Sequence, residues 1–183
     1  MNDSIKKILL DDETIQKRVK ELADQISEDY KDEKVMFIGI LKGSIAFMAD
    51  LMKAMSIDIQ IDFMAVSSYG ASTKSTGVVR ILKDLDADIK DKNILIIEDI
   101  IDTGTTLKYL MGYLQSRGPK SIKICSLLDK PDRRKADIKA DYIGFNIPDE
   151  FVVGYGLDYA EWCRGLPYIG ILKEEVYKND KTN

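Results

Sequence analysis

The stretch from Asn93 to Tyr113 reads NILIIEDIIDTGTTLKYLMGY, and it decides the fold. It begins with the apolar run Ile94 to Ile97, which is rich in β-branched side chains and short enough for a buried strand. Two acids follow, then a second apolar pair, then the small hydroxylated loop Asp102 to Thr106. Beyond the loop, leucine and methionine recur at helical spacing. The stretch therefore predicts a buried strand, an acidic strand end, a loop and a helix.

The predicted loop opens a helix, and that position suits an anion. The first N–H groups of a helix have no partner within it, and the helix dipole adds positive potential there. Thr103, Thr105 and Thr106 supply hydroxyl donors, and Gly104 lets a ligand come close to the backbone. The two acids before the loop would repel a bare phosphate. The pattern therefore indicates a bridging Mg²⁺ or chemistry on the substrate.

Size, composition and charge exclude several classes of protein. A chain of 183 residues with 45% hydrophobic and 32% charged residues is typical of one globular domain. A net charge of −4 and a pI near 5.0 argue against nucleic acid as the main partner. The sequence contains no apolar run of about 18 residues, so we expect no membrane contact. The polar N-terminus and the widely spaced Cys125 and Cys163 favour the reducing cytoplasm.

The chain contains no histidine. This excludes the Ser-His-Asp arrangement and zinc sites built on histidine. Any acid/base step must use Asp, Glu, Lys, Tyr or Cys, and a metal site should be built from carboxylates and hold Mg²⁺ or Mn²⁺.

The rest of the chain alternates helices with strands. The spacing of Ile15, Val19, Leu22 and Ile26 predicts an amphipathic helix, and Val35 to Leu41 predicts a central strand. Such alternation indicates an α/β fold with a mostly parallel sheet covered on both faces. Neither a dinucleotide fingerprint nor a P-loop is present.

Two patterns make narrower predictions. A helix after Ser44 should bury one side formed by Met48, Ala49, Met52 and Met55. A half-exposed strand should follow from the alternation of Ile57, Ile59, Ile61 and Phe63. Next, the segment Ser67 to Gly77 has no periodicity, and its composition fits a surface hairpin and a mobile lid about equally well.

The motif ILIIEDIIDTGTTL resembles the signature of the purine and pyrimidine phosphoribosyltransferases. Further motifs narrow the resemblance to the bacterial hypoxanthine-guanine type, and they favour the lid over the hairpin. These motifs are Leu41–Ser44, Asp62–Phe63 with Ser67–Tyr69, Ser126–Lys130 and Phe151–Tyr159. The resemblance implies a type I phosphoribosyltransferase-like α/β fold, with a central mostly parallel sheet flanked by helices, a small hood and a mobile loop. We expect one domain over residues 1–183, with the core at about 30–140, the hood from the N-terminal segment and about 141–183, and the mobile loop at 67–79.

The resemblance also implies an activity. A family member of this type transfers the 5-phosphoribosyl group from 5-phosphoribosyl 1-pyrophosphate to N9 of hypoxanthine or guanine, with Mg²⁺. The products are IMP or GMP and pyrophosphate, and the process serves purine salvage. Family members are commonly homo-oligomers, either dimers or tetramers.

Each part of the substrates receives residues by the resemblance. The ribose hydroxyls and the metal ion would be bound by Glu98 and Asp99. The 5′-phosphate would be held by the loop residues Asp102, Thr103, Gly104, Thr105 and Thr106. Asp102 is also at the position of the general base that takes the proton from N7 of the purine.

The purine and pyrophosphate receive the remaining residues. The purine would contact Lys130 at O6, Phe151 by stacking, the Val152 backbone, and Asp158, which also faces a second metal ion. Pyrophosphate would contact Lys42, Gly43 and Arg164, and the peptide before the lysine is cis in the family. The lid would begin at Ser68 and Tyr69.

Alternatives remain open at this point. A regulatory protein on the same fold would bind the sugar pyrophosphate and nucleic acid. An enzyme could instead prefer xanthine or adenine, although the contact from Lys130 would reject adenine. The chain also departs from the family, because Thr105 replaces a lysine found in some relatives and Gly156 loosens the base-binding loop.

Overall fold

A computed structural model of the chain describes residues 3–68 and 79–178. The strands are β1 (Ile5–Leu10), β2 (Val35–Leu41), β3 (Gln60–Ser68), β4 (Val79–Lys83), β5 (Asn93–Ile101), β6 (Ser121–Asp129), β7 (Tyr142–Asn146), β8 (Val152–Val153) and β9 (Ile169–Leu172). The helices are α1 (Asp12–Asp29), α2 (Ile45–Ala54), α3 (Thr105–Gln115) and α4 (Glu174–Lys178), and a 3₁₀ turn, η1, spans Pro131–Arg133.

The larger sheet has the strand order β4-β3-β2-β5-β6-β7. All neighbours pair in parallel except β4, which runs antiparallel to β3. The strand of the opening motif, β5, lies between β2 and β6, with Ile97 opposite both Gly39 and Cys125. This arrangement confirms the predicted α/β class and the mostly parallel sheet, and it brings the carboxyl ends of β2, β5 and β6 to one edge.

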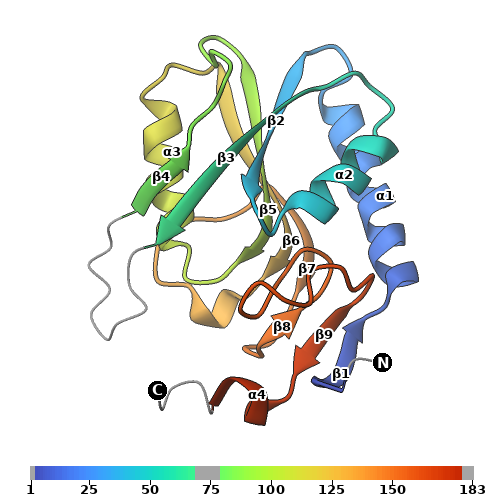
Figure 1. Cartoon of the computed structure of the whole chain (residues 1–183). Helices are drawn as coiled ribbons and strands as arrows, with labels where there is room; N and C mark the ends of the chain where they lie inside the picture. The colour runs from blue at the N-terminus through green and yellow to red at the C-terminus, as the bar shows by residue number, and fades with distance from the viewer. Residues whose placement is uncertain (1–2, 69–78, 179–183) are drawn as a thin grey trace.

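Helices cover both faces of this sheet (Figure 1). On one face, α1 and α2 pack against Val35 and Phe37 of β2. On the other face, α3 packs against Met36 and Ile38. Alternate side chains of one strand thus enter two separate clusters, which is why β2 reads as a continuous apolar run.

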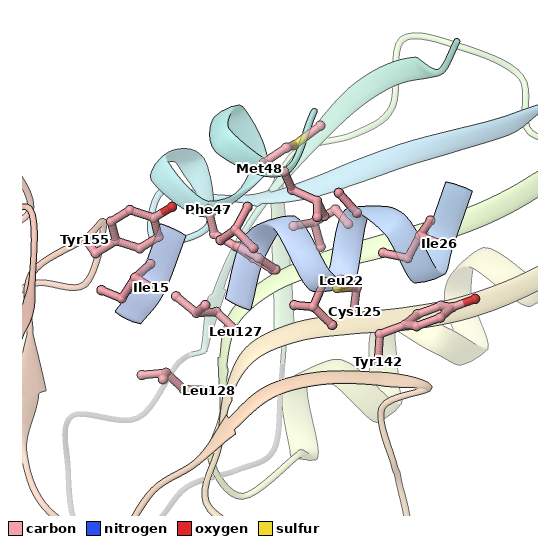
Figure 2. Close-up of a cluster of buried hydrophobic side chains, with 14 of the residues drawn as sticks. Ile15, Leu22, Ile26, Phe47, Met48, Cys125, Leu127, Leu128, Tyr142 and Tyr155 are labelled. Carbon is pink, nitrogen blue, oxygen red and sulfur yellow. The ribbon is translucent and has the colours of Figure 1, made fainter. Parts of the chain in front are cut away.

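The predicted helix over Ile15 to Ile26 is confirmed as α1. Its side chains enter the cluster shown in Figure 2, where Ile15, Leu22 and Ile26 are fully buried. The backbone N–H of Thr14 donates to Asp11 Oδ1 at 2.9 Å, so an aspartate caps the helix start. Burying each such aliphatic side chain is worth about 1.5–3 kcal/mol, so α1 is held mainly by this face.

Two of the narrower predictions are wrong in detail. The buried residues of α2 are Phe47, Met48 and Leu51, whereas Met52 is exposed. In β3, Asp62 and Met64 are buried while Ile61 is 46% exposed. Buried Asp62 accepts hydrogen bonds from the backbone N–H groups of Phe63, Asp86 and Ala87, so a polar side chain took a position that alternation assigned to solvent.

A second sheet has the order β1-β9-β8 and is antiparallel. It lies below the arrowheads of β2 and β3 in Figure 1. The sequence analysis assigned no strand to Ile5–Leu10, whose lysines hide the apolar pattern, although Ile5 pairs with Leu172. The division into core and hood stays a proposal. Strand β7 belongs to the larger sheet, and α1 packs against that sheet. Strands β1, β8 and β9 form the smaller sheet.

The segment expected to be mobile, 67–79, lies mostly outside the described residues, and Tyr69 lies outside them too. Ser68 is the last residue of β3 and lies opposite Val79. Within residues 3–68 and 79–178, helices long and apolar enough to cross a membrane are absent. Cys125 is buried, and no disulfide joins it to Cys163.

Candidate active site

A pocket of about 730 Å³ lies beyond the carboxyl ends of β5 and β6, where open α/β sheets bind their ligands. Its volume is in the range of small-molecule sites. Predicted site residues that line it are Asp102, Lys130, Phe151, Val152 and Asp158. Residues more than 50 positions apart in the sequence therefore meet at one pocket, next to the acids that end β5.

The acids Glu98 and Asp99 are held at the end of β5 in a poorly solvated place. Glu98 is buried, and burial raises its pKa well above the ordinary value, with neighbouring Asp99 adding to the rise. Burial raises the pKa of Asp99 to about 6, although the backbone N–H of Ile100 and the charge of Arg164 oppose the rise. Two carboxylates with raised pKa values mark a place that a cation would stabilise.

The loop Asp102–Thr106 leads into α3 as predicted. Gly104 has φ +77°, a left-handed conformation, and a Cβ atom there would meet Ile138. Both observations require glycine. The Thr105 backbone N–H donates to Thr103 Oγ1 at 3.4 Å, and no side chain caps α3. The first turn of the helix thus keeps N–H groups for an anion.

Asp102 lies at the rim of the pocket under two arginines. Arg133 Nε lies 2.6 Å from Asp102 Oδ1, an ion-pair contact without hydrogen-bond geometry. Arg134 Nη1 donates to the Asp102 carbonyl oxygen at 3.1 Å and pairs with Asp129. Arg133 of η1 therefore holds the carboxylate, and Arg134, the residue after η1, holds the backbone of Asp102.

Lys130 is a buried lysine, 7% exposed, at the end of β6. Its Nζ donates to the Glu150 carbonyl oxygen at 2.7 Å, and Asp149 Oδ1 lies 3.9 Å away. Burial lowers the pKa of Lys130, while Asp102 and Asp149 oppose the shift. The ammonium group of Lys130 lines the same pocket as Phe151. Beyond the hydrogen bond to Glu150, it has further N–H groups that can donate to a ligand.

Phe151 presents a 39% exposed ring to the pocket. It stacks on Tyr177 of α4, with 5.1 Å between ring centroids, and it meets Tyr159 edge-on at 5.6 Å. Val152 is buried in β8 and pairs with Ile171. The aromatic side of the pocket therefore includes the short C-terminal helix α4, which supplies Tyr177.

The Lys42-Gly43 loop lies against the acids. The Leu41–Lys42 peptide is cis, as the resemblance implies. A Cβ atom at Gly43 would overlap Oδ2 of Asp99, and one at Gly156 would overlap the Gly43 carbonyl oxygen. Three segments, one from the end of β2, one from β5 and one from the base-binding loop, thus touch where only glycine fits.

Arg164 connects this loop to Asp158. Its Nη2 lies 2.8 Å from Asp158 Oδ1, its Nη1 donates to the Gly156 carbonyl oxygen at 2.8 Å, and its Nε has no partner among the described residues. Glu161 Oε2 lies 2.9 Å from Lys42 Nζ and 3.3 Å from Arg164 Nη2. The two predicted pyrophosphate cations are therefore bridged by one carboxylate.

Residues of this site that the sequence did not predict include Ile100, Arg133, Asp149 and Tyr177, which line the pocket, and Glu161, which contacts Lys42. Ile100 could have been found, because it lies between the two acidic positions of the opening motif. The charge run from Asp129 to Lys135 hid Arg133, and no local pattern ties Glu161 to Lys42 or Tyr177 to Phe151.

A second cavity, of about 490 Å³, lies at the opposite edge of the sheet. Two of its charged side chains pair with each other, since Lys120 Nζ lies 2.6 Å from Glu33 Oε2, and Asn93 Nδ2 also donates to that oxygen. None of the predicted site residues lines it.

The described residues contain no group of three or more metal-ligating side chains. The acids at the end of β5 supply two carboxylates, and Asp158 contributes to the negative potential at Asp99, whose pKa its charge helps to raise. Mg²⁺ usually takes one or two carboxylates and completes its coordination with water and substrate phosphates. The donor set therefore fits a magnesium ion that arrives with a phosphorylated substrate.

Residues 6–160 match the family model described as "Phosphoribosyl transferase domain", and the chain belongs to this family. It is 59% identical over 177 residues to the hypoxanthine-guanine phosphoribosyltransferase of Staphylococcus epidermidis, covering 97% of this chain and 99% of that protein. The Bacillus subtilis enzyme of that name is 56% identical, covering 98% and 99%. A solved hypoxanthine phosphoribosyltransferase from Staphylococcus aureus superimposes with a TM-score of 0.93 at 56% identity, covering 97% of this chain and 96% of that one. These comparisons confirm the family and the fold expected from the opening motif.

Proposed function

We propose that the protein is a purine-salvage transferase. It moves the 5-phosphoribosyl group from 5-phosphoribosyl 1-pyrophosphate to N9 of hypoxanthine or guanine and releases IMP or GMP with pyrophosphate. The observation that carries the proposal is the meeting of Asp102, Lys130 and Phe151 at one pocket beside Glu98 and Asp99. The similarity to hypoxanthine-guanine phosphoribosyltransferases over nearly the whole chain supports it.

The purine binds in the pocket. Phe151 stacks on the ring, the Val152 backbone meets its edge, and Lys130 donates to O6, which adenine lacks. Asp102 accepts the N7 proton as N9 attacks the sugar, because the chain has no histidine for this step. Bond breaking at C1 leaves a sugar with oxocarbenium character, which the nearby carboxylates stabilise.

The phosphates bind on either side of the acids. Backbone N–H groups and hydroxyls of Thr103, Gly104, Thr105 and Thr106 hold the 5′-phosphate. Lys42, the Gly43 backbone and Arg164 hold pyrophosphate. Glu98 and Asp99 hold the ribose hydroxyls and Mg²⁺, and Asp158 faces a second ion. When bound, the metal neutralises the charge of the leaving group.

We further propose that the segment beginning at Ser68 and Tyr69 closes over the bound substrates and excludes water, which would otherwise hydrolyse the activated sugar. A cytoplasmic location of the protein is likewise a prediction.

A homo-oligomer, either dimer or tetramer, is the proposed assembly. Large apolar side chains lie exposed together around a small cavity between α2 and β3, with Ile45 53%, Met52 37% and Ile61 46% exposed. Such a patch is typical of protein interfaces. Light scattering coupled to gel filtration measures the assembly directly.

The main alternative is a regulatory protein that binds the sugar pyrophosphate and nucleic acid. The acidic pI of 5.0 and the pocket that joins Asp102 to Lys130 disfavour it. A preference for xanthine is the second alternative, and it would depend on the contacts that the protein makes at the purine 2-position.

One assay tests the proposal. Purified protein receives Mg²⁺, 5-phosphoribosyl 1-pyrophosphate and, in separate reactions, hypoxanthine, guanine, xanthine or adenine, and the monophosphate product is followed. We expect turnover of hypoxanthine and guanine and none of adenine. Failure to use any base would refute the enzyme, and adenine as the best substrate would refute the role given to Lys130.

A further inference from the structure

The pyrophosphate side of the site contains a carboxylate that the proposed reaction does not use. Glu161 Oε2 lies within 2.9 Å of Lys42 Nζ and 3.3 Å of Arg164 Nη2. A single carboxylate oxygen thus accepts from both cations, as a phosphate oxygen would.

We propose that Glu161 is an internal counter-anion that occupies the place of a pyrophosphate oxygen between Lys42 and Arg164, and that it withdraws when pyrophosphate binds. The inference rests on the proposed function, because that function assigns these two cations to the leaving group. In this role Glu161 weakens the binding of pyrophosphate and helps it to depart.

The contact is weak enough to be exchanged. The side chains of Lys42 and Glu161 are 67% and 64% exposed, and exposed ion pairs contribute little to stability. Lys42 and Arg164 both donate to the same carboxylate oxygen of Glu161. A multiply charged ligand at the same cations would therefore repel it.

The backbone around Glu161 forms a tight turn, closed by hydrogen bonds between the backbones of Tyr159 and Trp162. Ala160, Glu161 and Cys163 have φ values of +48°, +71° and +74°. L residues adopt this left-handed region at a cost. Within the loop, the Glu161 backbone N–H donates to Asp158 Oδ2 at 2.8 Å. The turn is therefore held without the Glu161 side chain, which can leave the cations by rotating about its own bonds.

The experiment compares Glu161→Gln with the unmodified protein. Glutamine keeps the size of the side chain and removes its charge. Calorimetric titration with magnesium pyrophosphate should show a Kd about two- to five-fold lower for the variant, as expected for one exposed charge pair. Steady-state assays should show a lower KM for the sugar pyrophosphate and stronger product inhibition by pyrophosphate.

A matched control is Glu28→Gln, which removes an equally exposed carboxylate paired with Lys31 on α1. It should leave the Kd for pyrophosphate unchanged. Thermal unfolding of both variants checks the fold, and Glu161→Asp, which keeps the charge, should bind pyrophosphate more weakly than Glu161→Gln.

The outcomes separate the inference from the proposed function. If the unmodified protein turns over hypoxanthine but Glu161→Gln binds pyrophosphate equally well or more weakly, the counter-anion role is refuted and the function stands. Weaker binding would mean that Glu161 orients the two cations instead. If the unmodified protein turns over no purine, the function fails, whereas tighter binding of pyrophosphate by the variant would still support the counter-anion.

Discussion

The two halves of the active site hold their charges in different ways. At the end of β5, burial raises the pKa values of Glu98 and Asp99, so these acids await a cation. On the loop after β8, Glu161 already shares its carboxylate between Arg164 of the same loop and Lys42, which follows β2. The first half is rigid, because its residues belong to a buried strand. The second half is a loop whose contacts can be exchanged. The comparison suggests that the buried half fixes the reacting groups while the loop half controls how the leaving group enters and departs.

The largest expected effect concerns Asp102, in the loop that directly follows the buried strand β5. Asp102→Asn should lower kcat by roughly 10²–10⁴, because it removes the proposed general base. The KM for the sugar pyrophosphate should change little, since that ligand binds mainly through other groups. Steady-state kinetics with hypoxanthine measures both values.

The matched control for this change is Asp132→Asn, which alters an exposed carboxylate on the neighbouring turn η1. It should leave kcat unchanged. An unchanged kcat in Asp102→Asn itself would show that Asp102 only supports the phosphate loop.

The contact between the halves can be broken at Gly43. A Cβ atom there overlaps the carboxylate of Asp99, so Gly43→Ala should shift the loop or the acid and lower kcat/KM by about 10²-fold. Gly165→Ala is the control, since its new Cβ has no neighbour within 4 Å. Kinetics of the two variants measures the effect, and equal values would mean that the two halves work independently.

Base selection is tested at Lys130, the buried lysine that follows β6. Lys130→Gln removes a charged donor, and such hydrogen bonds are worth about 1.5–3 kcal/mol, so the KM for hypoxanthine should rise by about 10–100-fold. Discrimination against adenine should fall in the same variant. Lys139→Gln, at an exposed position, is the control. An unaltered ratio of adenine to hypoxanthine turnover would contradict the role of Lys130.

The smallest effect concerns stability. The pKa of Asp99 is raised from 3.8 to about 6 in the folded chain. The folded state therefore loses stability as the pH rises through this window, because the unfolded chain ionises more readily. Asp99→Asn should raise the free energy of unfolding by about 1–2 kcal/mol at pH 7 without Mg²⁺, and the gain should disappear near pH 4.

Denaturant unfolding at the two pH values, without Mg²⁺, measures this difference. The control variant Asp132→Asn should change the free energy of unfolding by the same amount at pH 7 and at pH 4. If Asp99→Asn is no more stable than the unmodified chain at pH 7, the acids of β5 are not strained by burial, and the contrast between the two halves loses its basis.

Much of the fold could be predicted because it depends on local patterns. The spacing in α1 and the continuous apolar runs of β2 and β5 give both the element type and the burial. Predictions failed where a tertiary contact overrode the pattern. Asp62 is buried because the backbone after β4 donates to it, and the lysines of β1 concealed a strand that needs β9 as its partner.

The sequence by itself determined the class of fold, the acidic strand end, the phosphate-type loop and the family, because each depends on neighbouring residues. Only the tertiary structure brought Lys130, Phe151 and Asp102 to one pocket, stacked Tyr177 on Phe151, and set Glu161 between Lys42 and Arg164. These contacts join residues far apart in the chain. Packing of the two sheets, rather than spacing along the sequence, decides which charges meet.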